Sequence, residues 1–294
     1  MMPIEDAKVA IILVNFNGAD DTVECLDSIL EHATECQTIV VDNGSSGDDV
    51  GRIKSAHPWV ELIEAGSNLG FTGGNNLAIV RALEARVPWV FFLNNDTVIA
   101  PGAIESLIGI GDSSPEWGIL APRMDYYDHP GEPWFAGSEL DLKRGIAVHN
   151  NTTIPNAVTE LPWITGCAMF CRAEMLRQLG GFDDRYFLNW EDVDLSLRAR
   201  SNGWKLGIVP DALILHKVSR SLNRMSHWAT YYWTRNRLLW LREHAGGKGR
   251  WRATKDSLQN ALRAVVRHEP GAWSALHATV RGCADHFANR HGPR

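Results

Sequence analysis

The chain has 294 residues, of which 45% are hydrophobic and 22% charged, a composition that indicates a folded globular protein and excludes a disordered one. The longest apolar runs, 9–14 and 89–93, fall far short of the roughly 18 residues that a membrane-spanning helix needs, and the five cysteines show no CxxC spacing typical of zinc sites. The net charge of −6 is uneven, because residues 217–294 hold 15 Lys and Arg against 4 Asp and Glu; the acidic remainder disfavours nucleic acid as a partner.

Strands and helices are expected to alternate in the first part of the chain. Short apolar runs rich in β-branched residues predict buried strands at 9–14, 38–41, 60–64 and 89–93. The spacing of apolar residues predicts helices at 20–33, around Val50 and Ile53, and at 76–85, with the stretch 66–76 as a loop. This alternation is typical of βαβ units, so we expect an α/β fold with a mainly parallel central sheet flanked by helices.

The pattern changes after about residue 122. The stretch 123–160 is polar, turn-rich and irregular. Beyond it, the sequence predicts a strand within 164–172, a helix at 173–179 and a further helix that ends near Gly203. Two short strands are expected around Pro210, and the pattern from about residue 226 onward is helical.

Polar residues follow each of the four early strands. They are Asn15 and Asn17, then Asp42, then the 66–76 stretch, then Asn94-Asn95-Asp96. The carboxyl ends of parallel strands line one edge of a sheet, where ligands bind, so these side chains predict a site for a polar ligand. Each one alone is equally typical of a turn or a helix cap. The glycines of 66–76 fit neither the G-x-G-x-x-G pattern nor the P-loop pattern.

Six sequence motifs occur in the order found in one known family. Between residues 8 and 217 they are VNFNG, VVDNGS, NLGFTGGNN, LNNDT, TGCAMFCR and NWEDVDL. In these motifs the chain resembles the inverting family 2 glycosyltransferases of the GT-A fold. The LNNDT motif and the segment YYWTRNRLLWLREH (231–244) resemble rhamnosyltransferases that act on bacterial surface glycans. The resemblance implies a catalytic domain at 1–217, with a nucleotide-binding half at about 8–121 and an acceptor half at about 122–217, and a basic helical extension at 218–294.

The resemblance implies a sugar donor attached to a nucleoside diphosphate. Asp42 would accept the ring N3–H of the pyrimidine, which thymine and uracil share, so dTDP-sugars and UDP-sugars both fit. Asn15 and Asn17 would complete the pocket for base and ribose. Because glycine permits close approach of the backbone, the glycine-rich segment would contact the ribose and diphosphate. Its donor-binding residues would be Asn68, Gly70 and Asn76.

The segment Asn94-Asn95-Asp96 matches the Asp-x-Asp metal motif of the family in its last acid. The resemblance implies that Asp96, with Asn95 beside it, binds the donor through a divalent cation, Mg²⁺ or Mn²⁺, whose other ligands include diphosphate oxygens. His216 ends an apolar strand and is implied as a second metal ligand; imidazole favours manganese. The alternative for His216 is a helix cap or a turn residue exposed to solvent.

Asp192 in the NWEDVDL motif is implied as the general base, because inversion in a single displacement needs one carboxylate to take the proton of the acceptor hydroxyl. The donor and acceptor pocket would be lined by Gly166, Cys167, Trp190 and Glu191. The residues alone leave a simpler alternative. Acidic residues are favoured at the start of a helix by its dipole, and Trp190 is equally suited to core packing.

Basic residues and tryptophans interleave in the C-terminal extension, a pattern typical of an interfacial helix on anionic lipid. They are Arg235, Arg237, Arg242, Lys248, Arg250 and Arg252 with Trp233, Trp240 and Trp251. Docking on the catalytic domain and a homodimer formed through these helices are the alternatives. The start MMPIEDAK has neither the basic nor the apolar region of a secretory signal, so we expect a cytoplasmic protein that is peripheral at the inner face of the cell membrane.

These features predict a metal-dependent inverting glycosyltransferase that moves rhamnose from dTDP-rhamnose to a hydroxyl of a bacterial cell-surface glycan or lipid-linked acceptor. A transferase for a UDP-sugar is one alternative, and a non-catalytic scaffold that binds a nucleotide-sugar is another. Asn75, where the family often has Arg, favours the scaffold. The presence of Asp96, Asp192 and His216 favours the enzyme.

Overall fold

The computed structural model describes residues 7–218, 226–247 and 249–293, so Lys248 of the basic set lies outside the described residues. The strands are β1 (Val9–Asn15), β2 (Gln37–Asp42), β3 (Glu61–Glu64), β4 (Trp89–Leu93), β5 (Thr97–Ile99), β6 (Trp117–Tyr126), β7 (His129–Phe135), β8 (Ser138–Asp141), β9 (Ile146–His149), β10 (Thr159–Glu160), β11 (Ala168–Arg172) and β12 (Lys205–His216). The helices are α1 (Ala19–His32), α2 (Asp49–Ala56), α3 (Gly70–Glu84), α4 (Ala103–Ser113), α5 (Ala173–Leu179), α6 (Glu191–Ser201), α7 (Ser226–His244), α8 (Arg250–Val266) and α9 (Ala272–Phe287).

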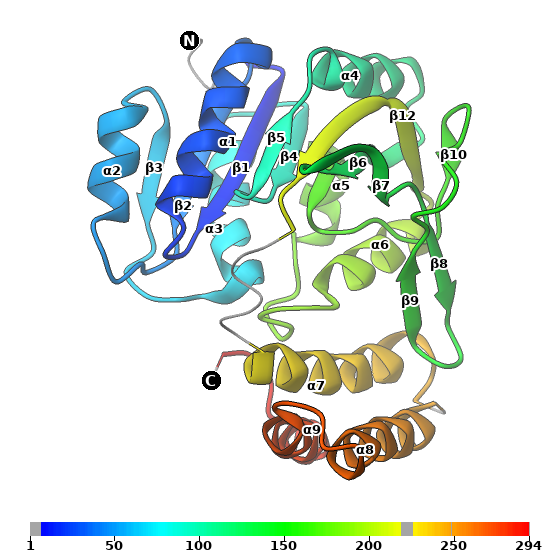
Figure 1. The fold of residues 1–294 in the computed structure, drawn as a ribbon. Coiled ribbons are helices and arrows are strands. Elements are labelled where there is room, and N and C mark those ends of the chain that lie inside the picture. Colours follow the sequence, from blue (N-terminus) through cyan, green and yellow to red (C-terminus); the bar gives the residue numbers. More distant parts are fainter. Residues whose placement is uncertain (1–6, 219–225, 248, 294) are drawn as a thin grey trace.

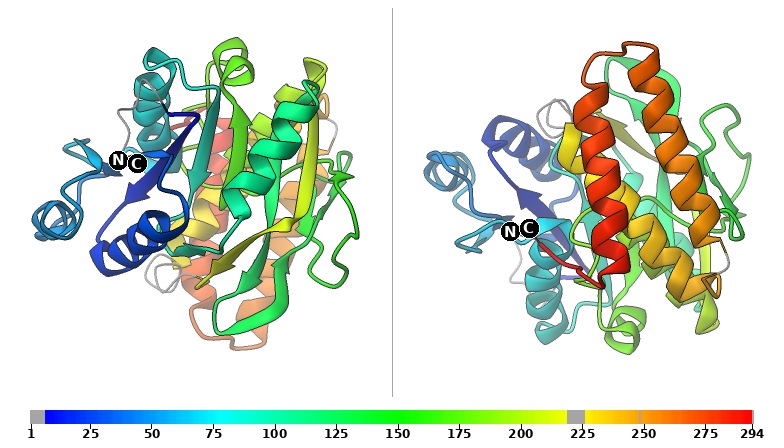
Figure 2. Two further views of the ribbon diagram at one scale, coloured as in Figure 1. Left: turned by 90° about the horizontal axis from the view of Figure 1, so that it is seen from above. Right: turned by 90° about the horizontal axis from the view of Figure 1, so that it is seen from below.

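Ten of the strands form one sheet, in the order β10-β12-β6-β11-β4-β1-β2-β3, with β5 paired to β12 and β7 to β6 (Figure 1). The part β4-β1-β2-β3 is parallel, as the sequence predicts. Strand β11 runs antiparallel to both β4 and β6 and so joins this part to the parallel pair β6 and β12. The early strands are almost continuously apolar because helices α1 and α3 lie on opposite faces of the sheet (Figure 2).

Two expectations about local structure are wrong. The stretch 66–76 is not a loop throughout, because helix α3 begins at Gly70 and contains most of the glycine-rich motif. The segment 205–217 forms one strand, β12, instead of two. Its pairing to β6 shifts between Val209 and Leu213, so Pro210 lies at an irregularity where its missing N–H removes no regular ladder hydrogen bond.

The three C-terminal helices pack against the second half of the preceding chain, residues 122–217. Helix α7 lies beside α6 and the β8–β9 hairpin, while α8 and α9 cover its other side (Figures 1 and 2). A second apolar core joins α7 to that half, with Trp240 and Leu239 against Trp163, Tyr186 and Trp190. In the described part of the chain, no helix combines the length and apolarity needed to cross a bilayer.

Candidate functional site

The ends of β1 and β2 lie side by side and carry a network of buried polar groups. Asn15 is opposite Asp42 in the parallel register, and its Nδ2 donates to Asp42 Oδ1 at 2.9 Å. The same amide donates to Asp49 Oδ2 at 3.0 Å, and the Ser45 hydroxyl donates to Asp42 Oδ1 at 2.6 Å. Asn15 is fully buried, so it contacts Asp42 and not solvent. Asp49 and Ser45 belong to this network but were not predicted from the sequence.

The network continues from β1 to the end of β4. Thr22 donates to Asn15 Oδ1 at 2.8 Å, and Asn95 Nδ2 donates to the Thr22 hydroxyl at 2.9 Å. Asp42 and Asp96 therefore lie on the same edge of the sheet, linked through three polar side chains. Asn17 is exposed at this edge, with its Oδ1 accepting from the Ser46 backbone N–H at 2.8 Å.

Asp96 and His216 are brought together by the pairing of β5 with β12. His216 lies opposite Thr97 in this antiparallel pair, and its Nε2 is 3.3 Å from Asp96 Oδ1. Both residues are buried, with 7% and 5% of their surface exposed. Within the described ranges, neither ring nitrogen of His216 has a hydrogen-bond partner, a costly state for buried polar atoms unless another group binds them.

An imidazole and a carboxylate that face each other fit a divalent cation. Across the described residues, no group of three or more His, Cys, Asp or Glu side chains is placed to hold a metal ion. Asp96 and His216 would therefore supply two ligands, and the oxygens of a bound ligand would have to supply the others. Next to this pair, Trp134 packs edge-on against both His216 and His149, and burial lowers the pKa of His149 to about 4.

Asp192 lies in the first turn of α6, where the backbone holds its carboxylate. Its Oδ2 accepts from the Gly166 N–H at 2.9 Å, and its Oδ1 accepts from the Val193 N–H at 2.8 Å. Burial nevertheless raises the pKa of Asp192 above its ordinary value. Glu191 beside it is buried more deeply, and burial together with the charge of Asp192 raises its pKa well above the ordinary value. The carboxylate of Asp192 is thus fixed in orientation and more basic than an exposed aspartate, the properties expected of the predicted base.

The segment 165–167 connects Asp192 to the edge that carries Asp96. Its Gly166 N–H binds Asp192, while the Cys167 carbonyl accepts from the Asn94 N–H at 2.8 Å. Burial raises the pKa of the Cys167 thiol well above its ordinary value, and the charges of Asp96 and Asp192 raise it further. Gly166 and Cys167 are adjacent, so the predicted base and the strand end that precedes the predicted metal ligand are bonded to the same short segment.

The loop before Asp192 has an unusual backbone. Phe187, Asn189 and Trp190 have φ angles of 64°, 68° and 74°, in the left-handed region that costs a non-glycine residue about 1–2 kcal/mol. The Phe187 carbonyl accepts the N–H of Phe71 at 2.7 Å, at the start of α3. Gly70 must be glycine at this contact, because its φ is +73° and a Cβ would lie 2.4 Å from the same carbonyl oxygen.

Helix α7 holds this strained loop through two buried residues. Asn236, with no exposed surface, donates through its Nδ2 to the carbonyls of Tyr186, Leu188 and Asn189 at 2.6, 2.7 and 2.9 Å. Arg235, only 1% exposed, donates to the Arg185 and Tyr186 carbonyls, both at 3.0 Å. These roles were not predicted from the sequence. The signal in the sequence is the position of Arg235 and Asn236 among aromatic residues, because polar groups that become buried need hydrogen-bond partners.

Other predicted site residues have structural contacts. Asn76 donates to the Phe182 carbonyl at 2.9 Å and to Asp184 at 2.7 Å, so it joins α3 to the acceptor half. Asn68 accepts the Gly70 N–H at 2.8 Å and so forms a turn just before α3. Trp190 is buried, 5.3 Å from the ring of Trp240 and 5.4 Å from that of Trp233.

A family model described as "Glycosyl transferase family 2" matches residues 10–180, more than half of the chain. Among curated proteins, the chain is 29% identical over 231 residues to the N-acetylglucosaminyl-diphospho-decaprenol L-rhamnosyltransferase of Mycobacterium tuberculosis, covering 69% of this chain and 75% of that protein. It is 26% identical to the rhamnosyltransferase WbbL of Escherichia coli K12, over 71% of this chain and 83% of that one.

Solved structures with a similar fold include two glycosyltransferases. The mannosyltransferase PcManGT from Pyrobaculum calidifontis, in complex with GDP-Man and Mn²⁺, aligns with a TM-score of 0.60 at 15% identity, covering 97% of this chain and 88% of that chain. GalNAc-T7 with UDP, GalNAc and Mn²⁺ aligns with a TM-score of 0.61 at 13% identity, covering 90% of this chain but 58% of that one. The expected GT-A-type fold is thereby confirmed, and the chain belongs to glycosyl transferase family 2 and is a glycosyltransferase.

Proposed function

We propose that this enzyme is a metal-dependent inverting glycosyltransferase that moves rhamnose from dTDP-rhamnose to a hydroxyl of a bacterial cell-surface glycan or lipid-linked acceptor. The observation that carries the proposal is the position of segment 165–167. It hydrogen-bonds to Asp192 on one side and to the end of β4, next to Asp96, on the other. A base and a metal-binding carboxylate next to the same segment suit a single displacement, in which the acceptor hydroxyl replaces the donor diphosphate.

Asp192 acts as the general base in this proposal. Its carboxylate takes the proton of the acceptor hydroxyl while that oxygen forms a bond to the anomeric carbon of the donor. The bond from this carbon to the diphosphate breaks on the opposite face, and the nucleoside diphosphate leaves with the electron pair. The backbone N–H groups of Gly166 and Val193 fix the carboxylate for this step, and such a base contributes typically ~10²–10⁴-fold to the rate.

The donor is bound along the sheet edge. Asp42 accepts the pyrimidine N3–H. Asn15, Ser45 and Asp49 orient the Asp42 carboxylate through the network at the ends of β1 and β2. Asp96 and His216 would hold a divalent cation, Mn²⁺ or Mg²⁺, which would neutralise charge on the leaving diphosphate. Two observations on the described residues support this assignment: His216 Nδ1 has no hydrogen-bond partner, and His216 Nε2 faces Asp96 Oδ1 at 3.3 Å.

The acceptor class is supported by the relatives. The M. tuberculosis protein is named for a sugar acceptor linked to decaprenol by a diphosphate, and WbbL for rhamnosyl transfer. A lipid-linked acceptor would need the enzyme at a membrane surface. The basic residues Arg235 and Arg237, expected to face lipid, instead bind backbone carbonyls of the same chain.

Different residues of the extension are available for a membrane. Large apolar side chains of α8 and α9 are exposed to solvent: Trp251 by 71%, Leu262 by 51%, Val266 by 77% and Trp273 by 73%. We propose peripheral contact with an anionic membrane through this set, because aromatic and aliphatic side chains insert at the lipid interface. Sedimentation with anionic vesicles tests this; a stable dimer in lipid-free solution that is lost in Trp273→Ser would assign the surface to a second copy.

Donor hydrolysis in the presence of Mn²⁺ tests the proposed function. We expect dTDP-rhamnose to be hydrolysed faster than UDP-sugars, with loss of turnover in chelator. Faster turnover of a UDP-sugar would assign a different donor. Binding of dTDP-rhamnose without turnover, even with a lipid-linked acceptor present, would indicate the non-catalytic scaffold.

A further inference from the structure

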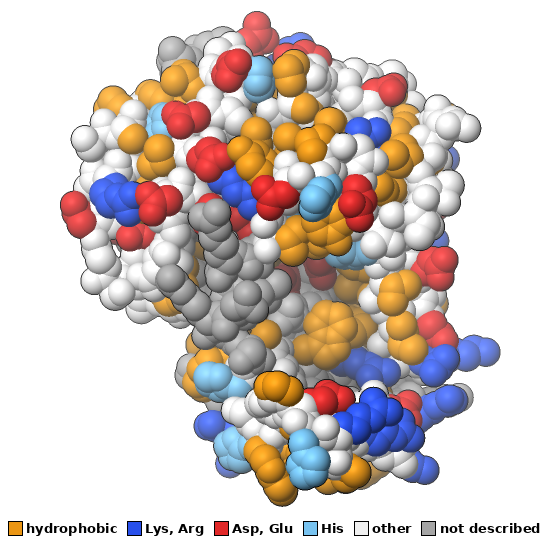
Figure 3. All heavy atoms as spheres, viewed as in Figure 1, with side chains coloured by type: hydrophobic (Ala, Val, Ile, Leu, Met, Phe, Trp, Pro, Cys, Tyr) orange, Lys and Arg blue, Asp and Glu red, His pale blue; other side chains and the backbone are white. Residues whose placement is uncertain are grey.

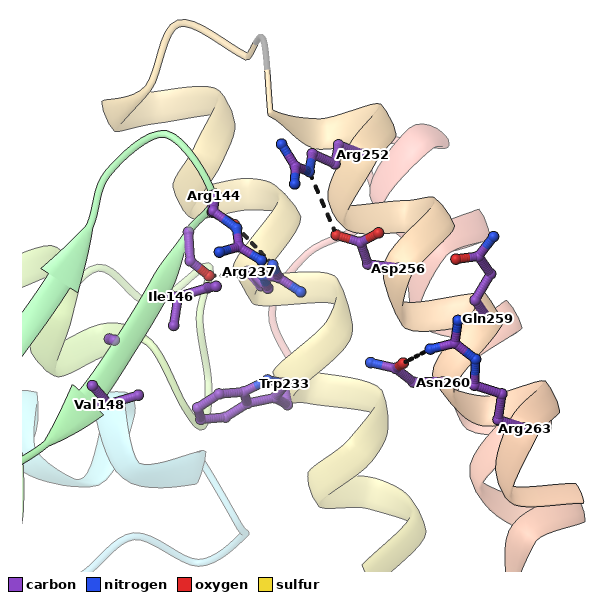
Figure 4. Close-up of a pocket in the computed structure, with 12 residues that line it drawn as sticks. Arg144, Ile146, Val148, Trp233, Arg237, Arg252, Asp256, Gln259, Asn260 and Arg263 are labelled. Atoms are coloured by element: carbon purple, nitrogen blue, oxygen red, sulfur yellow. Dashed lines mark hydrogen bonds and ion pairs between the residues drawn. The ribbon is translucent and has the colours of Figure 1, made fainter. Parts of the chain in front are cut away.

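A basic pocket lies between the β8–β9 hairpin and helices α7 and α8. It has a volume of about 510 Å³, and its polar lining residues include Arg144 of the hairpin turn, Arg237 of α7, and Arg252, Asp256 and Arg263 of α8 (Figure 4). In the space-filling view, the molecule is hollowed between the sheet and the C-terminal helices, with basic side chains near one end of the hollow (Figure 3). The hairpin belongs to the irregular stretch 123–160, so the pocket joins parts of the chain that the sequence did not connect.

The pocket carries four guanidinium groups and one carboxylate. Arg252 is 3.8 Å from Asp256, which offsets a single charge. Arg237 is fixed by its bonds to the Gly145 and Arg144 carbonyls, both at 2.8 Å. Its pKa is lowered by burial and by the positive charge of Arg144. Like charges converge here at an electrostatic cost, which a bound polyanion would remove, and arginine binds phosphate oxygens in paired hydrogen bonds.

Trp233 links the pocket to the catalytic base. It lines the pocket, is 48% exposed, and lies 5.4 Å from the ring of Trp190. Trp190 directly precedes Glu191 and Asp192 in the chain. A ligand in the pocket that extends past Trp233 would lie next to the indole that packs on Trp190, the residue before Glu191 and Asp192. An exposed tryptophan at this position offers an apolar face for a sugar ring.

We propose that this pocket binds the diphosphate of the acceptor, so that the acceptor is a sugar carried on a diphosphate, with the sugar directed past Trp233 to Asp192. The proposal rests on the proposed function, because it deepens the identity of the acceptor for the same reaction. Helix α8 supplies two of the four pocket arginines, and it also carries the exposed Trp251, Leu262 and Val266. A lipid attached to the diphosphate would thus leave the pocket beside an apolar surface.

The test is direct binding without donor, in the presence of EDTA, measured by calorimetry. The probes are N-acetylglucosaminyl diphosphate with a short alkyl chain and the neutral alkyl glycoside of the same sugar. The variant Arg144→Ala/Arg252→Ala/Arg263→Ala removes three exposed charges and leaves Arg237, which holds the hairpin. The control Lys255→Ala/Arg267→Ala/Arg281→Ala removes three exposed charges of the extension outside the pocket lining.

We expect the wild type to bind the diphosphate probe at least about tenfold more tightly than the neutral one, the pocket variant to lose this preference, and the control to keep it. Equal binding of the diphosphate probe by wild type and pocket variant overturns the proposal, as does an equal loss in the control. If the pocket variant loses binding to phosphatidylglycerol vesicles but still binds the probe, the pocket binds membrane headgroups and the proposal is overturned. Displacement of the probe by inorganic phosphate at similar affinity would also overturn the proposal. Because the measurement needs no turnover, it can fail or succeed independently of the proposed transfer from dTDP-rhamnose.

Discussion

Different contacts fix the proposed donor edge of the sheet and the loop that precedes Asp192. At the donor edge, neighbouring strand ends fix one another through short side chains, as Asn15, Thr22 and Asn95 do. The base loop has a strained backbone and depends on Asn236, a residue of α7 that follows it by more than 40 positions. The comparison teaches that the strand ends of the sheet fix one another, whereas the segment before Asp192, the proposed base, is also fixed by the C-terminal extension.

The variant Asp192→Asn should give the largest difference between the two regions, because it should slow transfer without weakening donor binding. We expect the rate of transfer to fall by about 10²–10⁴-fold, because the amide cannot accept the proton of the acceptor hydroxyl. The dissociation constant of dTDP-rhamnose should stay within about twofold, since the donor edge is untouched. Single-turnover transfer and calorimetry measure the two quantities, with the exposed Asp211→Asn as control. Transfer near the original rate would show that the base is another residue.

The converse change is His216→Ala at the donor edge. Loss of one of two protein ligands should weaken the affinity for Mn²⁺ in the presence of dTDP by about 10–100-fold. Electron paramagnetic resonance of free Mn²⁺ measures this affinity. His149→Ala is the matched control, because His149 also packs edge-on against Trp134 but no described contact joins it to Asp96. Equal metal affinity in wild type and His216→Ala would exclude His216 as a ligand.

The variant Asn236→Ala tests the dependence on α7. It removes the donor to three loop carbonyls, so we expect a loss of about 2–4 kcal/mol in the free energy of unfolding. The kcat of transfer should fall by about tenfold while donor affinity is kept. Urea unfolding and steady-state kinetics measure these effects. Asn260→Ala, exposed on α8, is the control for stability. A kcat equal to that of wild type would mean that the loop keeps its shape without α7.

The smallest expected effect concerns the extension alone. Burial lowers the pKa of His286 on α9 from 6.5 to about 4, so the folded state favours the neutral ring. Its contribution to stability is complete above pH 6.5 and is lost progressively as the pH falls toward 4. We expect the free energy of unfolding to be lower at pH 5 than at pH 7.5, on the order of 1 kcal/mol, with a smaller difference in His286→Gln. If the free energy of unfolding differs between pH 5 and pH 7.5 by as much in His286→Gln as in the wild type, other groups cause the pH dependence. The exposed His277→Gln serves as control.

The sequence predicted the donor edge better than the acceptor side for a physical reason. The β1, β2 and β4 strands are local apolar runs, and parallel pairing then requires that Asn15, Asp42 and Asn95 meet. The family resemblance added His216 and Asp192, which no periodicity reveals, and it gave Asp96 its predicted role as a metal ligand. Contacts between distant segments, such as those of Asn236 with the 186–189 carbonyls, leave no local pattern. The same holds for the bonds of Asn76, a predicted donor-binding residue, to Phe182 and Asp184.

The contact between the Phe187 carbonyl and the first turn of α3 has a mechanical consequence. The carbonyl accepts from the N–H groups of both Phe71 and Thr72, at 2.7 and 3.3 Å. Pulling these groups apart would leave amides without partners in an interior that water does not reach. Any shift of the glycine-rich turn is therefore transmitted to the peptide three residues before Trp190. A nucleotide-sugar bound against this turn, as in the proposed reaction, would therefore also change the orientation of the Asp192 carboxylate before the acceptor binds.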